Sequence, residues 1–331
     1  MLLELDRFQA GFHRRWHHLR DAHVRALAWL LDASDLLDPT AAQWEGKIAI
    51  LDIDPSALAR WLADLDAAPE ALHAYLNMAS ISRLGRYAEK LMAFYFTAQG
   101  TLVAHGLQVR AARNDTVGEF DFLLRDGDDL VHWELATKFY LFEASGKTEQ
   151  GDYFVGPNLA DTLGAKMEKI LQRQLALSSH PAAQAYLPQP VRHARALIKG
   201  WLFYHRNESV VLAPSGVAAA HCRGFWCTVD EFDRLEGSCF AVLPRLSWLA
   251  PARLPIAAGL NRDAMAAWLT AHFTDNAMPV MVALLQPDVG GQACDALSMG
   301  LEVSRGFIVP SDWRVRAGER MQRTVLRATT A

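Results

Sequence analysis

Alternating hydrophobic and polar positions predict a β-hairpin in the middle of the chain. Every second side chain is hydrophobic between residues 119 and 125, and a second alternating run follows from 131 to 140. Between them lies Asp126-Gly127-Asp128-Asp129, whose Gly and Asp residues tolerate the positive φ of a short turn. The pattern therefore predicts a tight hairpin over residues 118–140.

The position of the turn decides which side chains of this hairpin face each other. If Gly127-Asp128 is the two-residue loop, counting back through the alternation places Asp121 opposite Glu134. A loop that begins one residue earlier places Asp121 opposite His132 and leaves these groups on the same face. In the first register two carboxylates meet, which requires a compensating cation or an open, solvated face.

The alternation of hydrophobic and polar residues is compatible with two interpretations of this polar face. In one, a divalent metal ion compensates the two carboxylates. In the other, the face is the solvated side of a two-stranded ribbon, in which Lys138 pairs with Glu119, its diagonal neighbour.

Helical spacing of hydrophobic residues predicts the elements before the hairpin. Helices are expected over residues 5–31, over 55–64 with Asp54 as its N-cap, in a short stretch after Pro69, and over 82–98. Glu89 lies at the edge of the hydrophobic stripe of the last helix, where its carboxylate faces either a site or water. A strand over 101–112 then leads into the hairpin.

After the hairpin, Pro157-Asn158 introduces a predicted helix that runs to about residue 177, with Lys166 inside its hydrophobic stripe. Residues 195–204 form a nearly continuous hydrophobic run, which is typical of a buried strand. The central part of the chain is thus expected to follow the order helix, strand, strand, strand, helix, strand, within an α/β (α+β) fold.

Four regions are expected along the chain. Residues 1–80 form an N-terminal helical region and 81–205 the core, while 206–316 form an α+β region packed on that core. In this third region strands are predicted over 224–227, 240–249 and 280–285, and helices after Thr228 and Asn261; it has no recognisable catalytic motif. Residues 317–331 are polar and are expected to form a flexible tail.

Composition and charge narrow the classes of function. Of 331 residues 51% are hydrophobic and 21% charged, as in globular proteins, and the net charge is −4. A nucleic-acid partner would therefore need a local basic patch. No hydrophobic run is long enough to span a membrane, the first 20 residues lack the order of a signal peptide, and four cysteines do not make a disulfide framework. We expect a cytoplasmic protein without membrane association.

The central segment resembles the PD-(D/E)XK nuclease superfamily, in particular small resolvase-like members that carry a G-E-(I/F)-D strand, a hairpin and an E-x-K strand. The resemblance covers about residues 82–205. The matching residues are Gly85, Glu89, Gly106, Arg113-Asn114, Gly118-Glu119-Phe120-Asp121 and Glu134. The whole chain also resembles an uncharacterised bacterial domain family grouped with these nucleases, in which Trp133-Glu134-Leu135-Ala136, Lys138-Phe139-Tyr140 and Arg305-Gly306-Phe307 recur.

This resemblance implies a restriction-endonuclease-like core with a mixed sheet and a metal-dependent nuclease that cleaves phosphodiesters of DNA or RNA. By the resemblance, Asp121 and Glu134 would hold Mg²⁺ or Mn²⁺, and Glu89 would act as a direct or outer carboxylate. A backbone carbonyl after Glu134 would complete the protein's share of the ligands, and Lys138 would orient the attacking water.

The chain departs from the superfamily at the lysine. That lysine normally lies two residues after the glutamate, where this chain has Ala136, and Lys138 lies four residues after Glu134. In a regular strand this is about 13 Å instead of about 6.6 Å. A β-bulge near Ala136 could bring Lys138 closer, Lys166 could replace it, or the protein could be a catalytically inactive nuclease-fold protein that binds nucleic acid or a protein partner.

Nucleic-acid binding by a chain of this charge requires a basic rim. The rim is expected at Lys166, Lys169 and Arg173 of the helix after the hairpin and at Arg192 and Arg195, with Glu119 as a further nucleic-acid contact. A purely structural or interaction protein, in which Glu119 and Lys138 are simply paired, is the third possibility.

Overall fold

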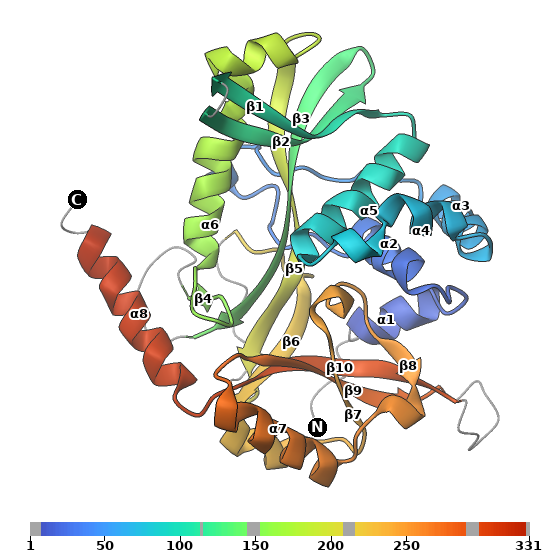
Figure 1. Cartoon of the computed structure of the whole chain (residues 1–331), viewed down its shortest axis with the longest axis vertical. Coiled ribbons are helices and arrows are strands. Elements are labelled where there is room, and N and C mark those ends of the chain that lie inside the picture. Colours follow the sequence, from blue (N-terminus) through green and yellow to red (C-terminus); the bar gives the residue numbers. More distant parts are fainter. Residues whose placement is uncertain (1–7, 113–114, 144–152, 208–215, 289–297, 329–331) are drawn as a thin grey trace.

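The computed structural model describes residues 8–112, 115–143, 153–207, 216–288 and 298–328. Over these ranges the helices pack against one large mixed sheet (Figure 1). This agrees with the predicted α/β (α+β) class. The strands are β1 (Leu102–Ala112), β2 (Asp115–Asp126), β3 (Asp129–Phe142), β4 (Phe154–Val155), β5 (Val191–His205), β6 (Cys222–Thr228), β7 (Phe240–Val242), β8 (Arg253–Pro255), β9 (Val280–Pro287) and β10 (Met299–Val309).

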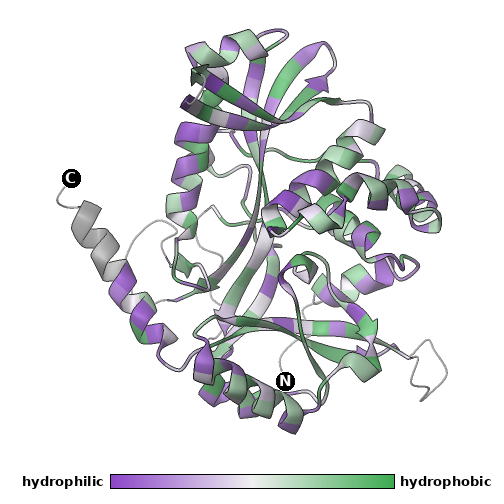
Figure 2. Cartoon of the chain, in the orientation of Figure 1, coloured by the Kyte–Doolittle hydropathy of each residue, from purple (hydrophilic) through white to green (hydrophobic). Residues whose placement is uncertain are grey.

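The longer helices lie on both sides of the sheet. In Figure 1 helices α1 to α5 lie on one side of the long central strands and α6 lies on the other. They are α1 (Phe8–Arg15), α2 (Ala22–Asp32), α3 (Pro55–Ala67), α4 (Glu70–Leu76), α5 (Leu84–Ala98), α6 (Leu163–Lys169), α7 (Arg262–Asp275) and α8 (Trp313–Ala328). Figure 2 shows that the long helices carry both hydrophilic and hydrophobic residues, as expected of helices with one face on a core.

Short helical turns connect these elements. A π-helical turn, η3 (Ile170–Gln174), continues α6. The 3₁₀ turns are η1 (Ala42–Trp44), η2 (Met78–Ser80), η4 (Leu175–Ser179), η5 (Pro181–Tyr186), η6 (Val229–Arg234), η7 (Arg245–Ser247) and η8 (Ile256–Ala258).

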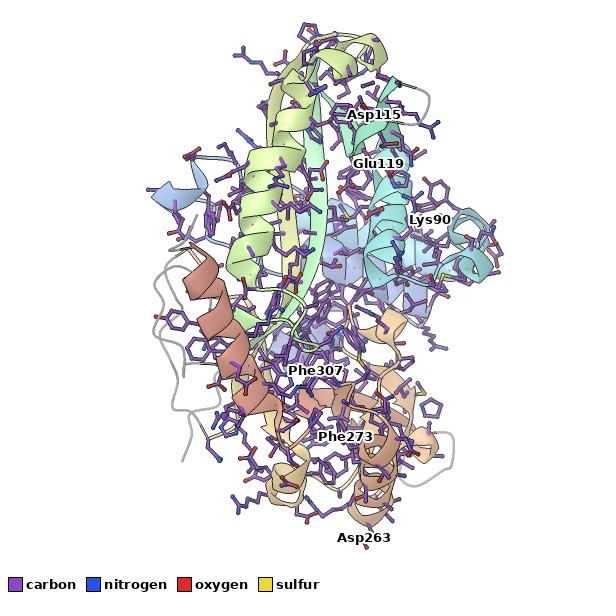
Figure 3. The ribbon with its side chains drawn as sticks, turned by 60° about the vertical axis from the view of Figure 1, so that its left-hand side comes forward. Lys90, Asp115, Glu119, Asp263, Phe273 and Phe307 are labelled. Atoms are coloured by element: carbon purple, nitrogen blue, oxygen red, sulfur yellow. The ribbon has the colours of Figure 1, made fainter. Side chains whose placement is uncertain are left out.

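Ten strands of the described ranges form this sheet, and its main path runs β1-β2-β3-β5-β6-β10-β9-β7. β1, β2 and β3 are antiparallel neighbours, whereas β5 is parallel to β3, β6 to β5 and β10 to β6. The predicted order helix, strand, strand, strand, helix, strand is therefore present as α5, β1, β2, β3, α6 and β5. The same sheet continues past residue 205 into the C-terminal region. Asp115 and Glu119 of β2 lie at the opposite end of the molecule from Asp263 of α7, with Phe307 of β10 between them (Figure 3).

The hairpin has the first of the two predicted registers. Arg125 pairs with Leu130 and Asp126 with Asp129, so the loop is Gly127-Asp128, and Gly127 has a φ of 59°. One detail differs from the alternation. Phe122 and Leu124 pack in the main core, but Phe120 packs in a separate cluster with Leu123 because β2 loses its regular pairing with β3 at this point.

The N-terminal helices differ from the predicted single helix over 5–31. Residues 8–32 form two helices because Asp21 ends the intervening segment as the N-cap of α2, where its side chain accepts hydrogen bonds from the amides of His23 and Val24. The predicted cap at Asp54 is confirmed by its hydrogen bond from the Ala57 amide, and α4 follows Pro69 as expected. Residues 5–7 lie outside the described ranges.

Several predictions for the second half of the chain need correction. The helix expected from residue 157 begins only at Leu163, after the N-cap Thr162. The strand expected over 240–249 ends at Val242, since Pro244 and η7 follow it, and β10 was not predicted from periodicity. Residues 317–328, expected as part of a flexible tail, continue helix α8, and Ala317 is buried.

A buried ion pair attaches the segment after β7 to strand β10. Arg305 and Glu302 are both fully buried, and Arg305 Nε lies 2.6 Å from Glu302 Oε1. The same guanidinium donates to the carbonyl oxygens of Trp248 and Ala250, and Glu302 Oε2 accepts from the amide of Ala252. These contacts position Trp248 beside β3.

Among the described residues, no helix combines the length and hydrophobicity needed to cross a bilayer.

Candidate functional site

A gap in the sheet lies along one edge of β3. The ladder between β2 and β3 ends at the pair Phe122–Trp133, and β4 joins β3 only at Leu141 and Phe142. Between these points no strand of the described chain pairs with this edge of β3, although β5 pairs with its other edge throughout. The predicted catalytic residues of the hairpin lie along this gap.

Asp121 and Glu134 meet where the two strands separate. The side chain of Asp121 takes the place of the missing ladder bond, because its Oδ2 accepts a hydrogen bond from the amide of Leu135 at 2.9 Å. The amide of Asp121 points in turn toward Glu134 Oε1 at 3.5 Å. The predicted juxtaposition of the two carboxyl groups is therefore present, and it lies in the interior because Glu134 is only 2% exposed.

Burial changes the protonation of this pair. It raises the pKa of Asp121, and the negative charge of Glu134 raises it further. Burial also raises the pKa of Glu134, whereas hydrogen bonds from the amide and the carboxyl group of Asp121 partly oppose this rise. Ionising both of two buried acids in contact is unfavourable, because their negative charges repel each other. The pair therefore holds one proton between them near neutral pH.

Two further side chains fix the orientation of Glu134. His132 Nε2 lies 2.8 Å from Glu134 Oε1, and Gln174 of η3 donates to Oε2 at 2.5 Å. Burial lowers the pKa of His132 to about 4, so the imidazole is neutral at physiological pH and its Nε2 carries the hydrogen that Glu134 accepts. Neither contact partner was predicted as a site residue: Gln174 lies 40 positions from Glu134 in the sequence, and His132 was considered only as the residue opposite Asp121 in the alternative register.

Glu89 approaches the pair from helix α5, on the other side of the gap. Its charge contributes to the raised pKa values of both Asp121 and Glu134, and burial raises its own pKa. Arg86, one turn earlier, forms an ion pair with Glu89 at 3.3 Å. The charge of Glu89 thus reaches both carboxyl groups of the hairpin, while its direct contact is the ion pair with Arg86.

Lys138 lies farther along β3 and does not join the carboxylates. The pairing of β3 with β5 is regular from Val131 to Leu141, so the β-bulge considered near Ala136 is absent from this ladder. The alternative pairing with Glu119 is also wrong, because Glu119 lies near Arg86 and accepts from Gln108. Burial lowers the pKa of Lys138 to about 8, and the neighbouring charge of Lys166 lowers it as well.

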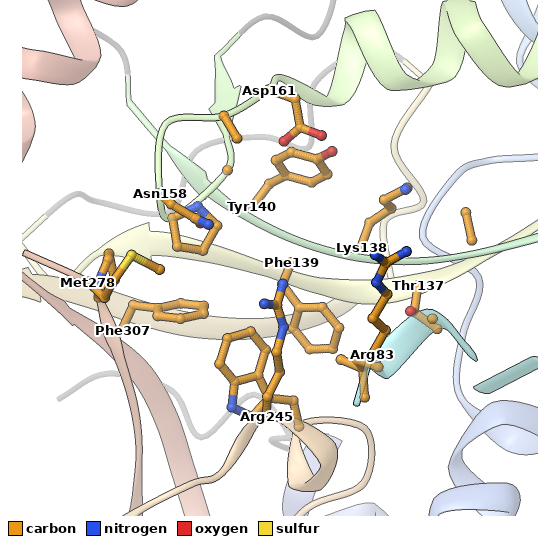
Figure 4. A pocket seen from close by; sticks show the side chains of 18 of the residues that line it. Arg83, Thr137, Lys138, Phe139, Tyr140, Asn158, Asp161, Arg245, Met278 and Phe307 are labelled. Carbon is orange, nitrogen blue, oxygen red and sulfur yellow. The ribbon is translucent and has the colours of Figure 1, made fainter. Parts of the chain in front are cut away.

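A cavity of about 530 Å³ occupies the gap and extends from Glu89 along β3 (Figure 4). Its wall includes the exposed edge of β3 and the loop after β4, with Gly156 and Asp161. Arg83, just before α5, and Arg245 of η7 also line it, together with aromatic side chains. These aromatic residues are Phe139, Tyr140, Trp248 and Phe307. Figure 4 shows Arg83, Lys138, Arg245 and Phe139 among the side chains that line the cavity.

The residues predicted as nucleic-acid contacts lie on the rim or outside it. Lys166 forms an ion pair with Asp161 at 3.4 Å, so it does not replace Lys138 at the carboxylates. Lys169 and Arg173 are exposed, and the charge of Lys169 reaches Lys138. Two of the three cations that line the cavity, Arg83 and Arg245, were not predicted. No local motif marks them, because they come from loops far apart in the sequence.

The donor set at the gap suits a hard cation only in part. Within the described ranges no group of three or more His, Cys, Asp or Glu side chains is arranged to hold a metal ion. The pair Asp121–Glu134 offers two adjacent carboxyl groups that share one proton, and Mg²⁺ commonly binds through one or two carboxylates together with water and substrate phosphate. Among the described residues this gap thus supplies two adjacent carboxyl groups and no third acidic ligand in such a group.

Comparison with known proteins yields one match. The family model described as domain of unknown function (DUF1853) matches residues 25–309, which include every residue of the gap and the cavity. No curated protein and no solved structure matches the chain. The family description states no activity and does not mention the PD-(D/E)XK superfamily.

Proposed function

Since the chain belongs to the DUF1853 domain family, whose description states no activity, we propose its function from the geometry of its own residues. The protein is a metal-dependent nuclease-like enzyme that hydrolyses phosphodiesters of DNA or RNA. The observation that carries this proposal is the buried pair Asp121–Glu134 at the separation of β2 and β3, with Glu89 beside it.

Three features support a core of the restriction-endonuclease type. The order α5, β1, β2, β3, α6, β5 is that of the superfamily the sequence resembles, and β5 lies parallel to β3. The acidic residues occupy the strand positions that correspond to its motif. The hairpin strands part at the acidic residues, and Leu135, whose amide donates to Asp121, lines the cavity beside β3.

Each residue of the pair has a separate task in this proposal. Asp121 is held by the Leu135 amide, and Glu134 is held by His132 and Gln174, so both carboxyl groups are positioned before any ligand arrives. Release of their shared proton gives the two negative charges that would hold Mg²⁺ or Mn²⁺. When bound, the ion would lower the pKa of a water molecule and neutralise charge on the scissile phosphate.

The test is cleavage by the purified protein with Mg²⁺ or Mn²⁺, measured with labelled single-stranded DNA, duplex DNA and RNA. Asp121→Asn keeps the size and the acceptor of the side chain but removes its charge, so we expect turnover to fall by about a hundredfold or more. Asp64→Asn, an exposed carboxylate on α3, is the matched control and should cleave like the wild type. Equal rates for wild type and Asp121→Asn would contradict the assignment.

A second candidate is a catalytically inactive nuclease-fold protein that binds nucleic acid or a protein partner. Ala136 favours it, because this residue occupies the position of the superfamily's lysine in a regular part of β3. Tight binding of oligonucleotides without metal-dependent turnover in any of the three substrates would select this candidate over the first.

A further inference from the structure

The cavity beside β3 has a positive charge that its lining carboxylates do not neutralise. It is lined by three cations, Arg83, Lys138 and Arg245, and by two carboxylates. Both carboxylates have cationic partners that do not line the cavity: Glu89 pairs with Arg86, and Asp161 pairs with Lys166. In contrast, none of the three lining cations forms an ion pair with a carboxylate of the described chain. The cavity is therefore electropositive, and it suits an anionic ligand.

The backbone of β3 adds donors along the same wall. The Leu135 amide points away from β5, toward Asp121. Since backbone groups of a strand alternate in direction, the amides and carbonyls of Thr137 and Phe139 point the same way, into the part of the gap that neither β2 nor β4 fills. Within the described chain, neither of these two amides donates to a backbone carbonyl of a turn or loop. An anion beside Lys138 would therefore also meet backbone N–H groups.

Aromatic side chains also line the cavity. The ring of Trp248 lies 5.5 Å from that of Phe139 and 5.2 Å from that of Phe307, and the guanidinium of Arg245 lies over Trp248 at 5.6 Å. Trp248 is held in place through its backbone by the buried Arg305. An electropositive groove with an aromatic wall is the combination that binds the backbone and bases of a single nucleic-acid strand.

From these features we infer that the cavity binds single-stranded nucleic acid, with a phosphate held by Lys138, Arg83 and Arg245 and a base packed against Phe139 and Trp248. This inference rests on the proposed function, from which it takes nucleic acid as the substrate. The binding that it describes does not require cleavage. A cavity of about 530 Å³ has room for a short piece of a single strand and cannot enclose a duplex.

The inference gives Lys138 a task that fits its position. Four residues of regular strand separate it from Glu134, about 13 Å at roughly 3.3 Å per residue. At that distance its ammonium contacts a phosphate next to the scissile one. Lys138 is then a substrate-binding residue that sets which phosphate reaches Asp121 and Glu134, and it does not orient the attacking water.

The experiment measures binding without chemistry. Fluorescein-labelled single-stranded and duplex DNA of the same sequence are titrated with the full chain in EDTA, and Kd is obtained from anisotropy at several salt concentrations. We expect the single strand to bind at least tenfold more tightly than the duplex. Lys138→Ala, Arg83→Ala and Arg245→Ala should each weaken single-strand binding about tenfold, and each should reduce the salt slope by about 0.7, the value for one phosphate contact on a single strand.

Control variants separate charge from folding. Arg60→Ala removes an exposed arginine of α3, distant from the cavity, and should leave Kd unchanged. Lys138→Arg keeps the charge and should retain most of the affinity. Equal binding by wild type and Lys138→Ala, or equal affinity for single strand and duplex, would overturn the inference.

The outcomes also separate this inference from the proposed nuclease activity. If single-strand binding depends on Lys138 but no metal-dependent cleavage occurs, the cavity assignment stands and the enzymatic proposal fails. If cleavage depends on Asp121 while Lys138→Ala binds normally, the enzymatic proposal stands and the cavity assignment fails.

Discussion

The amide of Asp121 points toward the carboxylate of Glu134, 3.5 Å away, at the point where β2 separates from β3. A continued ladder would have closed the space beside them. Instead the amide of Leu135 donates to the side chain of Asp121 in place of a backbone carbonyl of β2. Beyond this hydrogen bond the two strands separate. Two acids of raised pKa thus lie beside an electropositive cavity, which is an unfavourable arrangement for stability and a suitable one for binding a cation and a phosphate together.

Asp121→Asn should stabilise the protein at neutral pH in EDTA. The folded-state pKa of Asp121 is raised above its unfolded value, so its ionisation costs stability as pH rises above about 4, and none of this cost exists below that pH. We expect the variant to gain about 1 to 2 kcal/mol at pH 7 and nothing at pH 3.5, measured by urea unfolding. The exposed control Asp64→Asn should change neither value, and a variant less stable at pH 7 than the wild type would refute the argument.

Binding of a single strand should weaken as pH rises through about 8. Burial and Lys166 lower the pKa of Lys138 to about 8, and Lys169 acts in the same direction, whereas Asp161 and Asp121 oppose the shift. Since the ammonium loses its charge above this pH, Kd should rise about tenfold between pH 7 and pH 9.5. Lys138→Arg should remove this dependence because arginine stays charged. A pH profile identical in wild type and Lys138→Arg would contradict the prediction.

Gly200→Ala should strongly destabilise the fold. Gly200 of β5 lies beside Lys138, and an added Cβ would lie 2.0 Å from the carbonyl oxygen of Lys138, a backbone atom that cannot rotate away. We expect a loss of about 3 kcal/mol or more in unfolding free energy. The control is Gly11→Ala in α1, where nothing lies within 4 Å of the added Cβ, and where a gain of roughly 0.5–1 kcal/mol is expected. Similar effects at both positions would show that the close approach of β5 to β3 is wrong.

Arg305→Met should cost about 3–5 kcal/mol, because it leaves the carboxylate of Glu302 buried without its partner. The matched control is Arg316→Met, which breaks an exposed pair with Asp312 and should cost less than about 0.5 kcal/mol. Both are measured by urea unfolding. Tryptophan fluorescence should also change in the first variant, since Arg305 holds the backbone of Trp248 and lies over the ring of Trp201 at 4.3 Å. Equal costs for the two variants would contradict the structural role of Arg305.

The hairpin and its Gly127-Asp128 loop could be predicted from the sequence, because turn residues and the alternation of a strand depend on only a few neighbouring positions. The register that follows from this loop places Asp121 next to Glu134. The sequence also determined the caps at Asp54 and Thr228, and the stripe that buries α5 with Glu89 at its edge. It did not show where α1 ends, that β10 enters the sheet, or that residues 317–328 are helical.

Only the tertiary structure decided how the site is built. The separation of β2 from β3, the hydrogen bond from Gln174 and the distance between Lys138 and the carboxylates depend on packing between segments far apart in the chain. The same is true of the cavity, since Arg83 and Arg245 come from distant loops and face one ligand space only when the sheet has assembled. Short-range patterns specify strands and turns, but they carry no information about which distant loop supplies a charge.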